Sequence, residues 1–523
     1  MTCETATFLR STPLWRADDL AVAMQGRATP SVTTPVGSIS IDTRTLEPGA
    51  LFFAIKGDVH DGHVFVKAAL EKGAAAAVID EAHAGDFPAD APLIIVDDVL
   101  KGLERLGRAA RARHKGPAIA VTGSVGKTST KEMLRVALSG QGKVHASVAS
   151  YNNHWGVPLT LSRMPVDTDF GVFEIGMSNP YEILPLTAMV RPHVAIVTTV
   201  EPVHLAQFRA IEGIADAKGE IFSGLEPGGV AIINADNPHA ARLTAHAGAS
   251  RAGRIIRFGT GDNADVRLTE VHLDPDFSLV SADVFGMSVS YRIGAAGRHF
   301  AMNSLAVLAA VHVIGGDLAL AALSLQEFGN VEGRGKRLAL QIGERSFTLI
   351  DESYNANPSS MRAAMAVTGS VPRGSRGRRI AVIGDMLELG PESAFSELHR
   401  LSVTLDPGVE PGVEHHRVEV PGLHRLEVGL TGLRSSCRRR GEVQPGLRAP
   451  LRGGVPRPRG EQSDDRQEDR LDDGDHAVLT GPVRVVLVMG RDLLADLARR
   501  QTFAHVHPPD VSSGRGIGSA GAT

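Results

Sequence analysis

Residues 118–130 read AIAVTGSVGKTST and carry the strongest single signal in the chain. It predicts a buried strand, a glycine-rich loop and the start of a helix, so that backbone N–H groups and the helix N-terminus face a phosphate. Lys127 would reach the β- and γ-phosphates of a nucleotide, and the Thr128 hydroxyl would hold Mg²⁺. The full nucleotide-loop pattern has glycine where this chain has Val121. The alternative is a glycine-rich turn with an incidental Lys-Thr pair, which the preceding strand disfavours.

The sequence on both sides of this loop predicts an α/β fold with parallel sheets. The runs DFGVFEIG, HVAIVTTV and GGVAIINADN are mostly Val, Ile and Ala and end in Gly, Thr, Glu or Asp, which is typical of strands buried on both faces. A more polar, alternating stretch over 264–293 indicates a small antiparallel excursion. Upstream, as far as Arg113, short apolar runs alternate with helical stretches, a further α/β pattern.

The length of the chain predicts several domains. A chain of 523 residues is too long for one hydrophobic core and should hold about three domains. Gly116-Pro117 ends a basic helix, so we place a boundary there. We predict an N-terminal domain over 1–113, a central domain over 114–328 and the start of an incomplete, Rossmann-like C-terminal domain over 329–402.

The segment 403–523 differs in composition from the rest of the chain. It is rich in Arg, Gly and Pro, contains no Lys, Asn, Trp or Tyr, and has Phe503 as its only aromatic residue. Such a composition buries little apolar surface and predicts disorder. It is also the composition expected of a GC-rich gene read in a shifted frame. Only VRVVLVMGRDLLADLARR, near the end, predicts a strand and a helix.

Composition excludes several classes of protein. The formal net charge is -4, from 55 basic and 59 acidic side chains, and supplies no basic field for nucleic acid. Two cysteines, Cys3 and Cys437, exclude a disulfide framework and a cysteine-built zinc site. The first residues lack the regions of a signal peptide, and no stretch approaches the roughly 18 apolar residues of a membrane span. We therefore expect a cytoplasmic protein with no membrane insertion.

Glu174 is the next candidate after the phosphate loop. It stands at the end of the predicted strand DFGVFEIG. A carboxylate at the carboxyl end of a parallel strand, one strand away from a phosphate loop, is placed to bind Mg²⁺ directly or through water. The alternative is a loop acid that is satisfied within the protein.

A third cluster contains His204, Lys218 and Glu220. In the predicted helix IEGIADAKGEIFSGL, Lys218 lies on the same stripe as Ile214 and Phe222, so it projects from the apolar face. A snorkelling lysine whose stem covers the core is one interpretation. A buried amine that is neutralised by a pKa shift or by chemistry is the other. His204 alone is more often structural than a ligand.

Polar residues follow two strands of the third block. Asp351 to Pro358 reads DESYNANP after one strand, and GDMLELG begins at Gly384 after the next. Open α/β sheets bind ligands at the carboxyl ends of their strands. Turn chemistry is the alternative, because Asn, Asp, Gly and Pro are turn formers in any case.

Seven segments of the chain, taken together and in order, resemble the Mur ligases, the ATP-dependent amide ligases of peptidoglycan precursor synthesis. The similarity covers residues of about 38 to 400. The segment YNANPSSM is similar to that of the members that add D-alanyl-D-alanine, whereas the members that add diaminopimelate or lysine carry a DNPR-like motif. The segments are SIDTRTLEPGALFFAIKGDVHDGH, TGSVGKTSTKEML, YNNHWGVPLTL, AKGEIFSGL, HFAMNSLAVLAA, DESYNANPSSM and IGDMLELG.

The resemblance implies a role for each matching residue, with Lys127, His204 and Lys218 as the catalytic ones. The N-terminal domain would hold the UDP part of the substrate, and Lys218 would become carbamylated beside a metal ion. The implied ATP-binding residues are Gly123, Ser124, Val125, Gly126, Lys127, Thr128, Ser129, Asn303, Arg334 and Asp351. The implied metal ligands are Thr128, Glu174, His204 and Lys218. The implied substrate contacts are Thr43, Arg44, Asp61, His63, Asn152, Asn153, Tyr354, Asn355 and Asn357.

The resemblance also implies the reaction. A monomer would use ATP and Mg²⁺ to join D-alanyl-D-alanine to UDP-N-acetylmuramoyl-tripeptide through an acyl phosphate. The chain departs from the family in two places: VEPVHLAQF stands where the family has an AHLEGF-like run, and nothing after Leu401 matches. Two alternatives stay open: a related ligase of the folylpolyglutamate or cyanophycin type, and a relative that binds nucleotide but is catalytically impaired.

Overall fold

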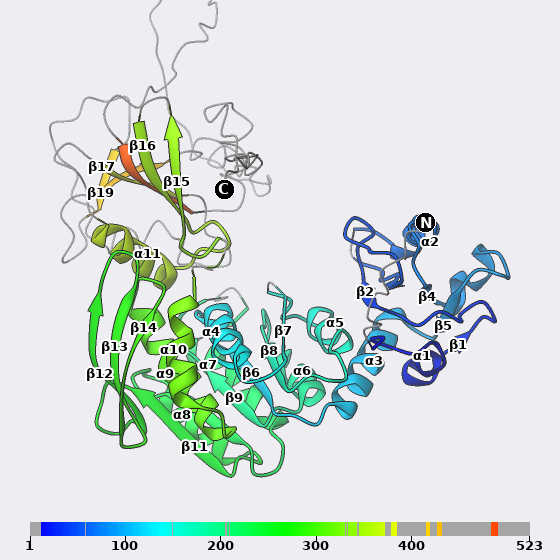
Figure 1. Ribbon diagram of the computed structural model, residues 1–523, viewed down its shortest axis with the longest axis horizontal. Coiled ribbons are helices and arrows are strands. Elements are labelled where there is room, and N and C mark those ends of the chain that lie inside the picture. Colours follow the sequence, from blue (N-terminus) through cyan, green and yellow to red (C-terminus); the bar gives the residue numbers. More distant parts are fainter. Residues whose placement is uncertain are drawn as a thin grey trace, which may run out of the picture.

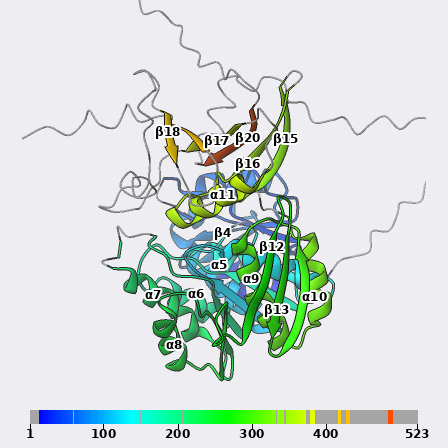
Figure 2. The ribbon, with the colours of Figure 1, turned by 90° about the vertical axis from the view of Figure 1, so that its left-hand side faces the viewer.

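The computed structural model describes residues 12–57, 59–148, 150–203, 207–208, 210–329, 331, 333–342, 345–371, 378–383, 415–418, 426–430 and 483–489. These residues form three sheets with helices packed against them, which confirms the predicted α/β class (Figure 1). The central sheet follows the first sheet along the chain and precedes the third. Figure 2 shows helix α11 (Pro358–Ser370) lying between the third sheet and the central layer. In the described part of the chain, no helix combines the length and the apolar character needed to cross a bilayer.

The first sheet has five strands in the order β1-β5-β4-β3-β2. Strands β2 to β5 run parallel, and β1 pairs with β5 in the antiparallel sense. All four residues of β3 and all four of β5 are buried, as expected for short apolar runs covered on both faces. The strands are β1 (Arg27–Ala28), β2 (Ser38–Ser40), β3 (Ala50–Phe53), β4 (Ala76–Asp80) and β5 (Leu93–Val96). The helices are α1 (Ala17–Met24), η1 (Gly62–Phe65), α2 (Val66–Glu71), η2 (Glu81–Asp86) and α3 (Val99–Arg113).

The central sheet has nine strands in the order β14-β13-β12-β11-β10-β9-β6-β8-β7. Strands β6 to β12 pair in parallel, and β12, β13 and β14 form the antiparallel excursion predicted over 264–293. The strands are β6 (Ala118–Thr122), β7 (Val144–Ala146), β8 (Phe170–Glu174), β9 (Val194–Val197), β10 (Val230–Asn234), β11 (Arg254–Gly259), β12 (Val266–Leu273), β13 (Ser278–Val284) and β14 (Met287–Ile293). The helices are α4 (Lys127–Ser139), α5 (Gly156–Ser162), α6 (Ile183–Val190), α7 (Ile211–Gly219), η3 (Glu220–Gly224), α8 (Ala240–Gly248), α9 (Arg298–Val313), α10 (Leu318–Ser324) and η4 (Leu325–Glu327).

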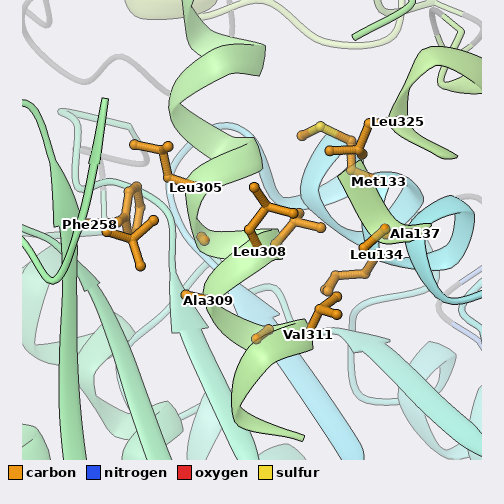
Figure 3. Close-up of a cluster of buried hydrophobic side chains, with 14 of the residues drawn as sticks. Met133, Leu134, Ala137, Phe258, Leu305, Leu308, Ala309, Val311 and Leu325 are labelled. Carbon is orange, nitrogen blue, oxygen red and sulfur yellow. The ribbon is translucent and has the colours of Figure 1, made fainter. Parts of the chain in front are cut away.

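Helices α4 and α9 pack together on one face of this sheet. Figure 3 shows Met133 and Leu134 of α4 directed toward Leu308 and Val311 of α9, and these four side chains belong to one buried cluster. Each of the four is essentially inaccessible to solvent. Truncating a side chain such as Leu308 to alanine in a core of this kind typically costs about 2–5 kcal/mol. The packing therefore fixes the helix that follows the phosphate loop.

The strand register explains why the candidate residues share one edge. Val121 of β6 pairs with Glu174 of β8 on one side, and Thr122 of β6 pairs with Val197 of β9 on the other. The phosphate loop leaves β6 at its carboxyl end, so it emerges between Glu174 and the loop that follows β9. This is the position at which open α/β sheets bind ligands.

The third sheet has six strands in the order β15-β16-β20-β17-β19-β18. The predicted strands around Asp351 and after Arg378 are present as β16 and β17, and the helix predicted from PSSMRAAMAVTG is α11. Strand β20, predicted from VRVVLVM, lies between β16 and β17 and runs parallel to both. The strands are β15 (Lys336–Ile342), β16 (Arg345–Asp351), β17 (Arg378–Ile383), β18 (His415–Val418), β19 (Leu426–Leu430) and β20 (Val483–Met489).

Three strands of the third sheet, β18, β19 and β20, thus come from the segment 403–523, and the sequence predicted one of them, β20. Strands β18 and β19 pair with each other, and β19 pairs with β17. The remainder of the segment, the segment GDMLELG and the helix predicted from ESAFSELHRL lie outside the described residues.

Candidate active site

Two glycines shape the phosphate loop between β6 and α4. Gly123 has φ of +151°, and a Cβ there would lie 1.9 Å from the Oγ1 atom of Thr198. Gly126 has φ of +85°, and a Cβ there would lie 2.7 Å from the Nδ2 atom of Asn303. Both positions require glycine, because a side chain would meet strain and a neighbouring group at once. The same geometry brings the predicted nucleotide contact Asn303 against the loop.

Lys127 is the first residue of α4 and directly follows the phosphate loop. Its Nζ atom donates to the carbonyl oxygen of Gly123 at 2.7 Å and to that of Ser124 at 3.4 Å. Burial lowers the pKa of Lys127, Glu174 opposes this shift, and Arg334 adds to it. These three charged side chains are therefore close enough to interact, and the lysine is directed at the loop that would hold phosphate.

Glu174 is fully buried at the end of β8 and is the centre of a polar cluster. Its Oε2 atom accepts a hydrogen bond from Thr128 Oγ1 at 2.9 Å, and its Oε1 atom accepts one from Asn152 Nδ2 at 2.7 Å. Ser150 Oγ lies 3.4 Å from the same Thr128 hydroxyl. A buried carboxylate beside hydroxyl oxygens is the type of donor set that suits Mg²⁺. The residues present thus fit a magnesium ion.

Lys218 lies in the last turn of α7 and is only 2% exposed. A snorkelling lysine keeps its ammonium group in water, so this burial argues against that interpretation. Burial, and then the nearby Lys127, hold the pKa of Lys218 well below its ordinary value. Among the residues that the structure describes, none forms an ion pair with it. The side chain is therefore a candidate for a neutral, reactive amine beside the phosphate loop.

His204, the other predicted catalytic residue, lies outside the described residues. Its neighbour Glu201 is described, and its backbone is bound to the phosphate loop: the Ser124 hydroxyl donates to the Glu201 carbonyl at 3.0 Å and accepts from the Glu201 N–H at 2.9 Å. Glu201 lies within the segment VEPVHLAQF, but no pattern there singled out its side chain.

Arg334, in the segment just before β15, reaches the same edge of the central sheet. Arg334 donates to Ser150 Oγ at 3.4 Å, and its guanidinium carbon lies 4.3 Å from the centroid of the Tyr354 ring. Asp351 is buried and accepts from the N–H groups of Gly333 at 3.1 Å and Ser353 at 3.0 Å. The structure thus brings Arg334, Asp351 and Tyr354 together next to the Thr128–Glu174 cluster.

Glu352 is a titratable neighbour of this group that the sequence did not single out. Desolvation raises its pKa to about 8, Arg334 opposes the shift, and Asp351 adds to it. A carboxyl group whose pKa lies near neutral pH is frequent at functional sites.

The predicted substrate-contact asparagines differ in what they do. Asn152 belongs to the Glu174 cluster, whereas the Asn153 side chain accepts from the Gly156 N–H at 2.9 Å at the start of α5. Asn357 caps α11, accepting from the Ser360 N–H at 2.9 Å in a capping box. Asn355 is exposed and accepts from the following N–H group, at 3.1 Å. Two of the four thus hold a helix start.

The predicted UDP contacts form a separate group on the first sheet. His63 is buried, its Nδ1 atom lies 2.6 Å from Asp61 Oδ1, and its Nε2 atom accepts from the Asp80 N–H at 3.3 Å. Its ring stacks on that of His83, with 3.8 Å between the centroids and 11° between the planes. A metal ion bound by imidazole lies in the ring plane, so two stacked rings cannot share one without moving. The group is therefore arranged for hydrogen bonding rather than for metal.

The other two UDP candidates lie on the loop after β2. Arg44 is bound to Asp42 through its backbone N–H and its guanidinium group; Arg44 is exposed and Thr43 is partly buried. The Thr43 carbonyl accepts from Lys72 Nζ at 2.7 Å. These residues are available to a ligand at the rim of the first sheet.

A cavity of about 290 Å³ continues the candidate site along the central sheet edge. Thr199, Asn234 and Thr260 line it from just past or at the carboxyl ends of β9, β10 and β11, and Glu201 and Arg298 complete the polar wall. Thr199, Asn234 and Glu201 lie in segments that the sequence marks as strands or as a departure from the family, but no pattern in those segments indicated a cavity.

Comparison with known proteins decides the family. The description "Mur ligase family, catalytic domain" matches residues 35–134, and "Mur ligase middle domain" matches residues 121–311. The chain is 36% identical over 357 residues to UDP-N-acetylmuramoyl-tripeptide--D-alanyl-D-alanine ligase of Bacillus subtilis (strain 168), an alignment that covers 68% of this chain and 75% of the relative. This chain belongs to the Mur ligase family.

Further proteins of the Mur ligase family are similar to this chain. The Escherichia coli (strain K12) protein of the same name is 35% identical, over 68% of this chain and 76% of the relative. The crystal structure of MurF from Acinetobacter baumannii is similar with a TM-score of 0.64 at 32% identity, covering 73% of this chain and 81% of that one. The MurF ligase of Thermotoga maritima, solved in complex with ADP, shares the fold with a TM-score of 0.57 at 24% identity. The chain is an ATP-dependent amide ligase of this family.

Proposed function

We propose that this Mur ligase joins D-alanyl-D-alanine to UDP-N-acetylmuramoyl-tripeptide and converts ATP to ADP and phosphate. The observation that carries the proposal is the meeting of Lys127, the Thr128–Glu174 pair and Lys218 at one sheet edge, with Arg334 joining Tyr354 to that edge. The names of the relatives support the choice of substrates.

The reaction proceeds in two steps at this edge. A carboxylate oxygen of the tripeptide attacks the γ-phosphorus of ATP, the bond to the β-phosphate breaks, and an acyl phosphate forms. The amine of D-alanyl-D-alanine then attacks the acyl carbon, and phosphate leaves from a tetrahedral intermediate. Lys127 and the loop N–H groups stabilise charge on the transferring phosphoryl group, and positioning of the reactants supplies much of the remaining acceleration.

Magnesium fits the oxygen donors described above. Thr128, Glu174, His204 and a carbamylated Lys218 would hold it, and the bound metal would supply positive charge against the phosphates. Carbamylation joins the neutral Lys218 amine to carbon dioxide with loss of one proton, and gives a carboxylate-like group in place of a buried ammonium ion. The low pKa of Lys218 favours this reaction because the attacking amine must be unprotonated.

The remaining assignments follow the three domains. The domain over 1–113 would bind the UDP part through Thr43, Arg44, Asp61 and His63, and the domain over 114–328 would bind ATP. Asn303, Arg334 and Asp351 would contact the nucleotide; Asn152, Asn153, Tyr354, Asn355 and Asn357 would contact the peptide substrates. We place the reaction in the cytoplasm, where ATP and nucleotide-linked precursors occur, and expect a monomer.

Phosphate release by the purified full-length chain tests the proposal. We expect release from ATP and Mg²⁺ to require both UDP-N-acetylmuramoyl-tripeptide and D-alanyl-D-alanine, and the pentapeptide product to form in equal amount. Turnover with a folate or cyanophycin substrate instead would identify the other branch of the superfamily. Nucleotide binding without ligation would identify a catalytically impaired relative.

A further inference from the structure

Hydrogen bonds join the phosphate loop to the backbone of the loop that follows β9. Ser124 donates its N–H to the Thr199 carbonyl at 2.9 Å, and its hydroxyl both donates to and accepts from the backbone of Glu201. Thr198 Oγ1 donates to the Val125 carbonyl at 2.5 Å. These contacts use no atom of the Glu201 carboxylate, so a substitution of that side chain leaves them in place.

The Glu201 carboxylate is directed instead at the third domain. Its Oε2 atom accepts from Ser359 Oγ at 2.8 Å, across 158 positions of sequence, and Thr199 Oγ1 lies 3.4 Å from Oε1. Ser359 stands in the first turn of α11, where a carboxylate is favoured by the helix dipole as well as by the hydroxyl donor. Glu201 also lines the cavity at the central sheet edge.

This contact differs in position from other polar contacts between the two domains. Arg334 reaches Ser150 from the segment that connects the domains. Arg337 pairs with Asp276 at 2.7 Å, near the tip of the β12–β13 hairpin, where the Asp276 side chain is 77% exposed. Of the residues in these pairs, Glu201 is the one whose backbone also binds the phosphate loop, and Ser359 lies two residues after Asn357.

We propose that Glu201 is a positioning residue that couples the phosphate loop to helix α11, so that capture of D-alanyl-D-alanine depends on its contact with Ser359. The inference rests on the proposed function for its substrate. When the loop is held by nucleotide, the backbone of Glu201 is fixed with it, and the carboxylate then holds the start of α11 and the Tyr354–Asn357 segment over the site.

Steady-state kinetics of the full-length chain with Glu201→Ala, Ser359→Ala and the double variant tests this coupling. We expect each single variant to raise the KM for D-alanyl-D-alanine about tenfold, the change that corresponds to losing one charge-assisted hydrogen bond. The KM for ATP should change less than about twofold, because the loop contacts are backbone contacts. The double variant should resemble either single variant, since the two residues act through one contact.

Two controls separate this role from general damage. Asp276→Ala breaks an ion pair between the same domains away from the site and should leave all three KM values unchanged. Glu201→Gln retains an acceptor oxygen for Ser359 and should recover most of the activity. Additive effects in the double variant, or an equal rise in the KM for ATP, would overturn the inference, as would wild-type kinetics for Glu201→Ala.

Small-angle scattering tests the role of Glu201 without any ligation reaction, so its result does not depend on the proposed substrate. Small-angle X-ray scattering with a non-hydrolysable ATP analogue should show the wild-type chain contracting and Glu201→Ala contracting less. If the wild type fails to ligate D-alanyl-D-alanine, the proposed function fails, whereas the scattering comparison still decides whether Glu201 couples the domains. Equal contraction of wild type and Glu201→Ala would refute the coupling.

Discussion

Charged residues gather at one edge of the first sheet and at one edge of the central sheet. The charged residues at the first edge bind one another, whereas the central edge holds a buried lysine that has no ion pair among the described residues. On the first sheet, Asp61, His63, Asp80 and His83 form a closed group in which each polar atom of His63 has a partner. On the central sheet, Lys218 is buried without an ion pair among the described residues and lies near a second ammonium group. Burying a charge without a counter-charge is costly, so the second arrangement is stable only with an altered protonation state or a ligand.

A group that only holds its loop differs from a reactive group in how its polar atoms are satisfied. Both groups contain charged residues that are next to glycine in the sequence, and composition does not separate them. Mutual satisfaction of hydrogen bonds marks the first group as one that holds its loop. Burial lowers the pKa of Lys127 and Lys218 in the second group, whereas hydrogen bonds within the first group shift the pKa values of Asp61 and His83. Buried amines of this kind make the second group the candidate for acting on a ligand.

The largest expected effect comes from removing the loop lysine. Lys127→Ala should lower ATP turnover by about a thousandfold, in the range of lost oxyanion-type stabilisation, since the side chain serves phosphate rather than packing. Phosphate release measures turnover, and circular dichroism should show an unchanged fold. Normal phosphate release by a folded variant would contradict the assignment of the loop.

Lys218→Ala should remove ligation, and formate or acetate should restore part of it, because the proposed role is that of a small anion beside a cation. The expected loss is about a hundredfold or more. Lys131 offers a matched control: it is also fully buried, but it donates to the Ser147 carbonyl at 2.7 Å and pairs with Glu132. Lys131→Ala should lose stability and gain nothing from added carboxylates. An active Lys218→Met enzyme would show that Lys218 is only a core lysine.

Local patterns explain what the sequence could predict. The strands, the phosphate loop and the position of Glu174 at a strand end depend on runs of a few residues, and the structure has them. The bond between Thr128 and Glu174 depends on β6 and β8 being neighbours, and the contact of Arg334 with Ser150 spans 184 positions. No local pattern contains such information.

Contacts between distant parts of the chain also explain why sequence patterns did not indicate some residues. Glu201 stands in a loop whose importance comes from its partners Ser124 and Ser359, which lie far away in sequence. Strands β18 and β19 come from a segment of low apolar content, where periodicity is weak. The resemblance to the family predicts Asn357 as a substrate contact, whereas the structure shows it as the N-cap of α11 in a capping box with Ser360.

His63→Ala, in the group on the first sheet, should have a smaller effect than the two lysine substitutions. It should destabilise the protein by about 1–3 kcal/mol, since Asp61 and the Asp80 N–H lose a buried partner. The KM for the UDP-linked substrate should rise as the loop loosens, whereas the KM for ATP should stay unchanged. Urea unfolding and kinetics measure the two. A raised KM for ATP would show that the two edges are not independent.

The smallest expected effect is a pH dependence of stability at the first edge. The hydrogen bond to Asp80 raises the pKa of His83, burial opposes the shift, and Asp61 and Asp86 add to it. A histidine whose pKa is raised on folding stabilises the protein fully below its unfolded pKa, about 6.5, and loses that contribution as pH rises through the folded value. Wild-type Tm should therefore fall slightly more than that of His83→Gln as pH rises from about 6 to 8, by about 1 °C for a single, partly buried pair. Identical pH profiles for the two proteins would mean that the Asp80–His83 contact carries no net charge pairing, and that the first edge is held by neutral hydrogen bonds and ring stacking alone.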